Sequence, residues 1–334
     1  MKGAAEDRLQ SFLARRRGSG ALDDVQALSG DASTRRYFRV SWEAKSSAVV
    51  AVYPEPFAAD AHPFLEVHNL LAGWGIPVPQ LLAVDGDCGL VVLEDLGDTT
   101  LQEHLRSAAP AERQRLYVAA LDMLRQLQVA AAAQPSAAGC YGLVFDREKL
   151  VWELELFVEH FIEGHRGRVV PQVERAALTV CFERLCEEIA SWPRVLCHRD
   201  FHSRNLMWHR ERLVWIDYQD ARMGPVTYDL ASLLCDAYVD VPDALLDECI
   251  EGFRRDAAPC ETPEEFRGRF DLTAAQRTLK ALGTFGYQAV VRGNPTYLEY
   301  VPRTLGVARR SLARHPALGE LHGLLARHIE ELRA

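Results

Sequence analysis

A short polar loop followed by two apolar runs limits how this chain can fold. The loop reads CHRDFHSRN, and it leads into NLMW at 205–208 and RLVWID at 212–217. Two short apolar runs separated by a few residues indicate a β-hairpin. Because a hairpin turns the chain back on itself, we expect Asn205 and Asp217 to emerge near one rim, next to the loop that carries Asp200.

The chain changes its pattern near residue 98, well before this loop. The first part predicts strands joined by small-residue turns, with two helices, over residues 4–16 (helix), 29–40 and 47–54 (strands), 64–74 (helix) and 80–97 (two strands). The second part carries apolar residues at helical spacing over 111–133, 147–163 and 172–191, and helices continue to about 327. A small strand-rich part followed by a larger, mainly helical part predicts an α+β protein.

Composition excludes several classes of function. Of 334 residues, 48% are hydrophobic, so the chain can bury a sizeable core. A formal net charge of −9 opposes binding to the phosphate backbone of nucleic acids. The eight cysteines form no C-x-x-C pair, and no apolar stretch is long enough for a signal peptide core or a membrane span. We therefore expect a cytoplasmic protein with no membrane and no nucleic-acid partner, and no obligate protein partner is evident.

Three oxygen-bearing side chains around the loop suit phosphoryl transfer. The pattern H-R-D-x-x-x-x-N runs from His198 to Asn205 and matches the catalytic loop of kinases, in which Asp200 would be the base and Asn205 a metal ligand. Asp217 would be the second metal ligand, since Mg²⁺ prefers oxygen donors and keeps several waters. The alternative is a polar loop that merely caps a hairpin.

The sequence around the loop also resembles a known superfamily. LCHRDFHSRNLMW and LVWIDYQDARMGPVTYDLASLL closely resemble the aminoglycoside phosphotransferase and choline kinase superfamily, and the resemblance extends over roughly 25–330. It implies a protein-kinase-like bilobal fold that uses ATP and Mg²⁺. The N-lobe, 1–97, would hold the phosphate loop and hinge. The C-lobe, 98–334, would hold the catalytic loop and the acceptor site.

The same resemblance assigns further residues. GDASTRRYFRV is similar to the phosphate loop and second strand, LVVLEDLGDTTL to the hinge, and YDLASLL to a segment whose Asp229 holds the catalytic core. The nucleotide-binding residues that it implies are Gly30, Ala32, Ser33, Thr34, Arg36, Glu94 and Leu96.

A narrower resemblance points to the acceptor. SGDASTRRYFRV, CHRDFHSRNLMW and WIDYQDARMGPVTYDLASL look like the bacterial anomeric kinases that phosphorylate N-acetylmuramate and N-acetylglucosamine in peptidoglycan recycling. This resemblance implies an amino sugar acceptor and a sugar 1-phosphate product. Residues placed to contact the sugar are His202, Arg204, Gln219 and Asp220. Candidate partners for a lactyl carboxylate are Arg204, Arg222 and Arg292, because guanidinium fits a carboxylate in two-point contact.

One departure from the kinase pattern leaves alternatives open. Kinases carry a lysine on the third strand, whereas residues 47–57 contain none. The nearest lysine, Lys45, precedes the strand and is expected in a solvated turn, so the candidate cations are Arg35, Arg36 and Arg39. Strand alternation puts Arg35 and Arg39 on the opposite face from Arg36. Two rival hypotheses therefore remain: a phosphotransferase for aminoglycosides or other small alcohols, and a non-catalytic nucleotide-binding module with a kinase fold.

Overall fold

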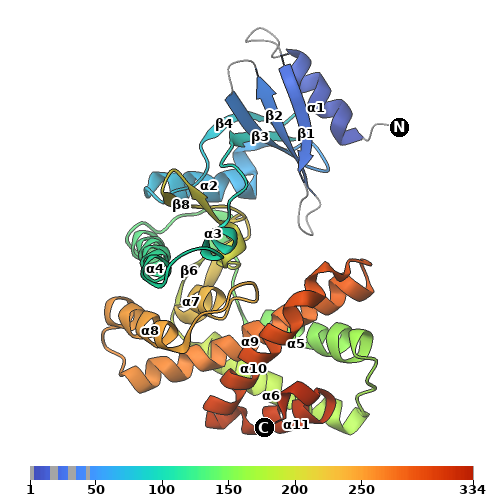
Figure 1. Ribbon diagram of the computed structural model, residues 1–334, viewed down its shortest axis with the longest axis vertical. Helices are drawn as coiled ribbons and strands as arrows, with labels where there is room; N and C mark the ends of the chain where they lie inside the picture. The colour runs from blue at the N-terminus through green and yellow to red at the C-terminus, as the bar shows by residue number, and fades with distance from the viewer. Residues whose placement is uncertain (1–3, 16–21, 29–34, 43–45, 334) are drawn as a thin grey trace. The chain divides into compact units, whose positions relative to one another are not determined.

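The computed structural model describes residues 4–15, 22–28, 35–42 and 46–333 and divides into two compact units. The first comprises Met1–Thr99 and Met207–Gln219, and the second Thr100–Leu206 and Asp220–Ala334. A strand-rich first unit and a helical second unit confirm the α+β prediction (Figure 1). The expected lobe boundary after residue 97 lies close to the first crossing, but the expectation did not include the return of 207–219 to the first unit.

The first unit is built on a five-stranded antiparallel sheet of order β1-β2-β3-β5-β4. Alternation along β2 buries Phe38 and Val40 on one face and directs Arg39 to the other. Helix α1 covers the apolar face with Leu9 and Phe12. The strands are β1 (Leu22–Leu28), β2 (Arg36–Trp42), β3 (Ser46–Val52), β4 (Leu81–Asp85) and β5 (Leu90–Glu94), and the helix is α1 (Ala4–Arg15).

The segment that follows the predicted hairpin packs on the second helix of this unit. The elements are α2 (Pro63–Gly73), preceded by a 3₁₀ turn η2 (Ala59–Ala61), and the hairpin strands β7 (Leu206–His209) and β8 (Arg212–Trp215). Past β8, the Tyr218 hydroxyl lies 2.8 Å from His68 Nδ1, and its ring stacks on Phe64. The backbone N–H of Trp215 donates to the carbonyl oxygen of Pro77 at 2.8 Å. These contacts explain why a segment so late in the chain belongs to the first unit.

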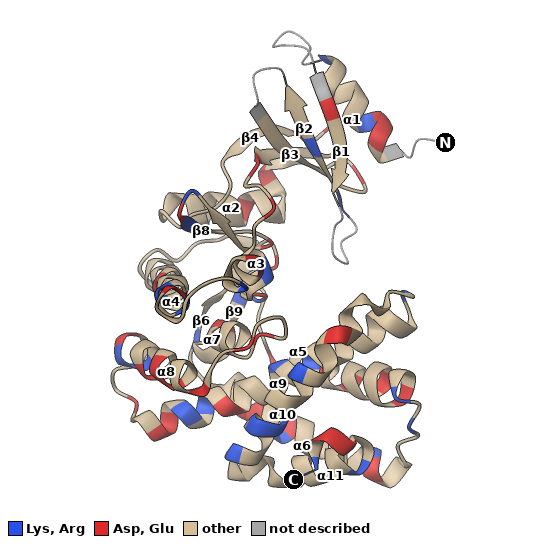
Figure 2. Cartoon of the chain, viewed as in Figure 1, with Lys and Arg blue, Asp and Glu red and all other residues tan. Residues whose placement is uncertain are grey.

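The second unit is helical apart from the two-stranded β6 (Arg194–Cys197) and β9 (Arg222–Pro225). Its α-helices are α3 (Leu101–Leu105), α4 (Pro110–Ala133), α5 (Arg147–Leu156), α6 (Gln172–Ser191), α7 (Thr227–Leu234), α8 (Asp243–Ala257), α9 (Pro263–Val290), α10 (Val301–Arg314) and α11 (Gly319–His328). A π-helix, η4 (Phe157–His165), continues α5, and 3₁₀ turns cover η3 (Gly139–Tyr141), η5 (Ser203–Asn205), η6 (Pro295–Tyr300), η7 (Pro316–Leu318) and η8 (Glu330–Leu332). Figure 2 shows acidic and basic residues interspersed along these helices.

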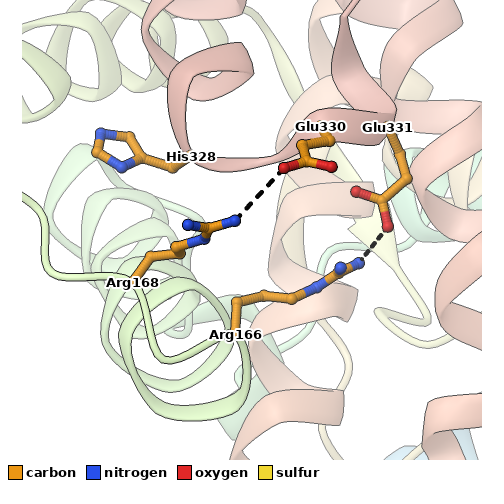
Figure 3. A pocket seen from close by; sticks show the side chains of 5 residues that line it. All are labelled: Arg166, Arg168, His328, Glu330 and Glu331. Atoms are coloured by element: carbon orange, nitrogen blue, oxygen red, sulfur yellow. Dashed lines mark hydrogen bonds and ion pairs between the residues drawn. The ribbon is translucent and has the colours of Figure 1, made fainter.

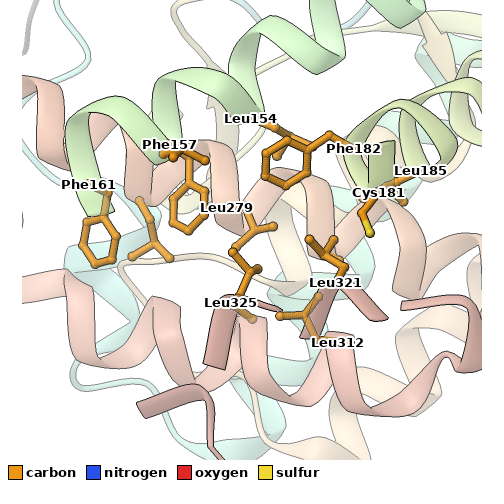
Figure 4. Close-up of a cluster of buried hydrophobic side chains, with 14 of the residues drawn as sticks. Leu154, Phe157, Phe161, Cys181, Phe182, Leu185, Leu279, Leu312, Leu321 and Leu325 are labelled. Atoms are coloured by element: carbon orange, nitrogen blue, oxygen red, sulfur yellow. The ribbon is translucent and has the colours of Figure 1, made fainter. Parts of the chain in front are cut away.

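Helix α9 runs through the centre of this unit. It begins at a capping box in which Thr262 and Glu265 exchange hydrogen bonds, and it packs against α5, η4, α7 and α10. Fully buried apolar side chains from α5, η4, α6 and α11 meet Leu279 of α9 in one cluster (Figure 4). Hydrophobic burial therefore fixes α9 as the central helix. Across the described ranges, we find no helix with the length and apolar character needed to span a bilayer.

Two glycines let α9 touch the π-helix backbone to backbone. A Cβ atom on Gly286 would lie 2.4 Å from the carbonyl oxygen of His160, and one on Gly283 would lie 2.8 Å from Phe157 Cα. Both distances are shorter than non-bonded contacts allow, so any larger residue would have to separate the two helices.

We predict that Gly286→Ala lowers the melting temperature although alanine favours helix. The gain in helix propensity is about 1 kcal/mol, whereas overpacking against rigid backbone costs about 1–3 kcal/mol or more. Gly252→Ala in α8 is the matched control, because a Cβ atom there meets nothing within 4 Å. In thermal unfolding, the melting temperature of Gly252→Ala should equal or exceed that of the parent protein, and that of Gly286→Ala should be lower. Equal melting temperatures for the two variants would contradict this explanation.

Candidate active site

The polar loop after β6 is held in place by one buried carboxylate. Asp229, in the first turn of α7, accepts hydrogen bonds from the backbone N–H groups of His198 at 2.6 Å and Arg199 at 3.0 Å. Arg199 adopts the left-handed conformation, with φ of 86°, which a non-glycine residue keeps only when its surroundings enforce it. Burial raises the pKa of Asp229 to about 7, while the two N–H groups and Arg277 act in the opposite direction.

Asp200 lies among cations in the second unit. Its Oδ1 atom is 3.2 Å from Lys280 Nζ and 3.8 Å from Arg277, and its Oδ2 atom is 3.7 Å from Arg199 Nε. Burial alone would raise the pKa of Asp200, but these cations, led by Lys280, outweigh it and hold the pKa well below its usual range. Asp200 is therefore ionised at neutral pH, the form in which a carboxyl group can take up a proton.

Asn205 is fixed by the backbone of the same loop. Its Nδ2 atom donates to the carbonyl oxygen of Asp200 at 2.9 Å, and its own N–H donates to His202 O at 2.9 Å. Since the amide nitrogen is used within the loop, the amide oxygen is the atom that can bind a cation.

Asp217 lies in the first unit, two residues beyond β8. It has a φ of 63°, and its side chain is 43% exposed. Its Oδ1 atom accepts hydrogen bonds from Arg35 at 3.2 Å and from Gln219 Nε2 at 2.9 Å. Arg35 also lies over the rings of Tyr37 and Tyr53.

The chemistry of these donors fits a hard divalent cation. Asn205 offers an amide oxygen and Asp217 a carboxylate, and Mg²⁺ commonly binds through one or two such groups together with waters and phosphate oxygens. Within the described ranges, no three His, Cys, Asp or Glu side chains form a metal-binding group of their own. Asn205 belongs to the second unit and Asp217 to the first, and their joint role as metal ligands stays a prediction.

The residues predicted for the nucleotide fall into two groups. The first group lies outside the described residues and comprises Gly30, Ala32, Ser33 and Thr34. Lys45 also lies outside them. Arg36 forms an ion pair with Glu6 of α1 at 2.7 Å, on the face of the sheet that α1 covers. Arg39, on the opposite face, is held by Asp95 and Asp98, each at 2.8 Å.

The two predicted hinge residues both contact the hairpin strand β7. Leu96 is buried in a small apolar cluster with Met207 and Val214, and its carbonyl oxygen accepts a hydrogen bond from His209 Nδ1 at 3.0 Å. Glu94, at the end of β5, has one carboxylate oxygen 3.6 Å from His209 Nε2. Nucleotide binding by these residues remains a prediction.

The residues predicted for the sugar are divided between the units. Burial lowers the pKa of His202 to about 3, so its imidazole is neutral at neutral pH, and its ring meets Tyr238 edge-on. The guanidinium of Arg204 lies 4.8 Å from the centre of the same ring. Asp220 is paired with Arg199 at 2.9 Å in the second unit, whereas Gln219 belongs to the first.

Two of the cations beside Asp200, Arg277 and Lys280, were not predicted from the sequence. Arg277 and Lys280 lie three residues apart on α9, more than seventy positions after the loop, and no motif connects them to it. Arg277 also donates to the carbonyl oxygen of Arg199 and to Ser232. Two basic residues three positions apart on an otherwise buried helix are the signal that could have identified them.

A surface pocket of the second unit lies elsewhere and contains none of the predicted site residues. Figure 3 shows its side chains, two arginines, two glutamates and a histidine. Arg166 pairs with Glu331 at 2.7 Å and Arg168 with Glu330 at 3.4 Å, so the charges of the lining cancel. This pocket gives no indication of an active site.

Comparison with known proteins decides the family. The model of the phosphotransferase enzyme family matches residues 24–269, which include the loop, the hairpin and Asp229. The chain belongs to this family. It is therefore an enzyme that transfers phosphoryl groups, a kinase, as the resemblance of its motifs implied.

Similar proteins span nearly the whole phosphotransferase chain. The N-acetylmuramate/N-acetylglucosamine kinase of Pseudomonas aeruginosa is 34% identical over 325 residues, which cover 94% of this chain and 91% of the relative. The enzyme of the same name from Neisseria meningitidis is 34% identical, with 92% of each chain covered. An ADP-bound aminoglycoside phosphotransferase, APH(2'')-Ib, is similar in structure, with a TM-score of 0.57, 14% identity, and 90% and 96% of the two chains covered. The last similarity supports the fold alone.

We predict that Lys280→Met moves the acid limb of the pH–rate profile to higher pH. Lys280 stabilises the ionised form of Asp200, so its removal raises the pKa of the carboxyl group, and the group is then protonated at a higher pH as the solution is acidified. The measurement is kcat/KM for phosphoryl transfer across a pH series.

Lys280→Arg is the matched control, because it keeps a cation next to Asp200. Its profile should follow that of the parent enzyme. If the methionine variant loses activity equally at every pH, Lys280 does not act through the ionisation of Asp200.

Proposed function

We propose that this kinase phosphorylates N-acetylmuramate and N-acetylglucosamine at the anomeric hydroxyl, using ATP and Mg²⁺, to give the sugar 1-phosphate for peptidoglycan recycling. The observation that carries the proposal is the 34% identity to two enzymes named N-acetylmuramate/N-acetylglucosamine kinase, over more than nine tenths of this chain. An ionised Asp200 in the loop that the family uses for catalysis supports it.

The phosphoryl donor follows from the family and the donor atoms. A protein of the same fold carries ADP, and we extend nucleotide binding to this chain as part of the proposal. We assign the amide oxygen of Asn205 and the carboxylate of Asp217 to a Mg²⁺ ion, which would neutralise charge on the phosphate oxygens. Arg35, beside Asp217 in the first unit, is a cation in a position to take part of the role of the missing strand lysine.

The acceptor hydroxyl suits the base. A carboxylate with a depressed pKa is a weak base, so it orients a hydroxyl by accepting its hydrogen bond and takes the proton only as transfer proceeds. An anomeric hydroxyl is more acidic than an ordinary sugar alcohol, which lowers the demand on Asp200. Phosphoryl transfer relies mainly on positioning and charge, and we assign the positioning of the hydroxyl to this loop.

Both rival hypotheses are less consistent with the second unit. An aminoglycoside is a polycation and would need acidic surroundings, whereas Asp200 is surrounded by Arg199, Arg277 and Lys280. A non-catalytic module would not need Asp200 to be kept ionised by three cations at the cost of their mutual repulsion. We therefore prefer a neutral or acidic sugar as the acceptor.

We place the reaction in the cytoplasm, where ATP is available. All eight cysteines are free thiols, which suits a reducing compartment. The proposal requires only small-molecule partners, the nucleotide and the sugar.

A coupled assay of ADP release tests the function directly. We expect turnover with N-acetylmuramate and N-acetylglucosamine and little or none with kanamycin. Phosphorus NMR should show a product whose phosphate is released by mild acid, because glycosyl phosphates are acid-labile while phosphates on other sugar hydroxyls are not. Turnover with kanamycin alone, or an acid-stable product, would refute the proposal.

We predict that Asp200→Asn lowers kcat by about 10²–10⁴-fold, the usual contribution of an acid–base group. Binding of ATP with Mg²⁺, measured by calorimetry, should persist because the amide keeps the shape of the side chain. Asp122→Asn, at a half-exposed position on α4 away from the loop, is the control. Near-normal turnover of Asp200→Asn would exclude Asp200 as the base.

A further inference from the structure

Two cations next to the catalytic loop take no part in holding Asp200. Lys149 lies on the first turns of α5, and Arg222 begins β9. Arg222 is one of the partners predicted from the sequence for a carboxylate, whereas no function was predicted for Lys149. We call Lys149 and Arg222 the basic pair.

Backbone contacts bring the two elements together. The N–H of Phe145 donates to the carbonyl oxygen of Met223 at 2.9 Å, and the N–H of Met223 donates to Leu143 O at 2.9 Å. Asp146 then caps α5 through the N–H of Lys149 at 2.8 Å. The start of α5 is thus fixed beside the start of β9, immediately after Asp220.

Helix packing connects α5 to the helix that carries the counter-ions of Asp200. Helices α5 and α9 lie against each other (Figure 1). Glu153 of α5 is buried and accepts a hydrogen bond from Gln276 at 3.0 Å, one residue before Arg277. Lys149 lies one turn before Glu153, so it is held on the same side of α5 as the catalytic loop.

The local charge favours an anion. Arg199 is paired with Asp220, and Lys280 with Asp200. By contrast, Arg222 donates to a backbone oxygen and lies over the ring of Phe145, contacts that leave its charge unbalanced. Lys149 lies 3.9 Å from Glu153 Oε1, beyond hydrogen-bond distance, while the other oxygen, Oε2, accepts a hydrogen bond from Gln276.

The surroundings of Lys149 are those of a site that needs a negative group. Burial lowers the pKa of Lys149, Glu153 raises it, and Arg199, Arg222 and Lys280 lower it further. An added anion would relieve this repulsion. The Lys149 ammonium also lies 3.8 Å from the centre of the Trp152 ring, and this tryptophan is 49% exposed, an apolar surface of the kind on which sugar rings stack.

We propose that the basic pair binds the carboxylate of an acidic sugar acceptor and thereby makes the enzyme prefer N-acetylmuramate to N-acetylglucosamine. This inference rests on the proposed function, because the two sugars differ only in the lactyl ether that carries the carboxylate. Arg204, the alternative partner, lies instead over the rings of Tyr238 and Tyr297. Arg292 is exposed beyond the end of α9.

Steady-state kinetics of Lys149→Met and Arg222→Met with both sugars test the inference. Loss of a charged hydrogen bond should lower kcat/KM for N-acetylmuramate by about ten- to a hundredfold. The value for N-acetylglucosamine should fall far less, and it reports at the same time on folding. Arg147→Met is the matched control, since Arg147 lies on the same helix but pairs with Glu183 at 2.6 Å, and it should leave both values unchanged.

Several outcomes would overturn the assignment. Equal losses on both sugars would indicate a structural role for the basic pair, and a raised KM for ATP would indicate a phosphate site instead. A selective loss of N-acetylmuramate in Arg204→Met, but not in the variants of the basic pair, would move the carboxylate to Arg204. If the parent enzyme phosphorylates neither sugar, the proposed function fails. Calorimetry then tests the basic pair separately, because the inference requires N-acetylmuramate to bind more tightly than N-acetylglucosamine.

Discussion

The hydrogen bonds from two consecutive backbone N–H groups to Asp229 are the interaction on which the catalytic loop depends. They hold Arg199 in the left-handed conformation and so determine the direction in which Asp200 leaves the strand β6. An unpaired carboxylate at this depth would be costly, and unpaired N–H groups would be as well. Each satisfies the other, which makes the strained conformation stable without glycine.

Helix α9 supplies the second half of this arrangement. Its buried apolar face fixes its position in the core of the second unit. Arg277 and Lys280 extend from this helix to the loop and place cations beside Asp200 that the loop itself does not contain. The position of a charge beside Asp200 is therefore a consequence of hydrophobic packing along the helix. Arg277 links the catalytic loop to α7, because it donates hydrogen bonds to the carbonyl oxygen of Arg199 and to the side chain of Ser232.

Much of the fold was predictable from periodicity, and the loop from its motif. The predicted helices and strands are present, including the hairpin, although its turn residues Arg210 and Glu211 are not the usual Asn-Gly and still adopt the positive φ values of a type I′ turn. Strand β1 was missed, because LDDVQAL lacks clear alternation. The cations around Asp200 were also missed, since side chains far apart in sequence meet only through tertiary packing. For the same reason, the sequence could not tell that Tyr218 ties residues 207–219 to α2.

The glycine contact between α9 and the π-helix has a consequence for how such an enzyme can change over time. Gly283 follows Lys280 by less than one turn, so the surface where the two backbones touch lies next to the residue whose ammonium group contacts Asp200. Here no flexible side chain absorbs a displacement. A substitution that separates the two helices would therefore displace the ammonium group, so the position of the cation beside Asp200 depends on residues that contact neither group.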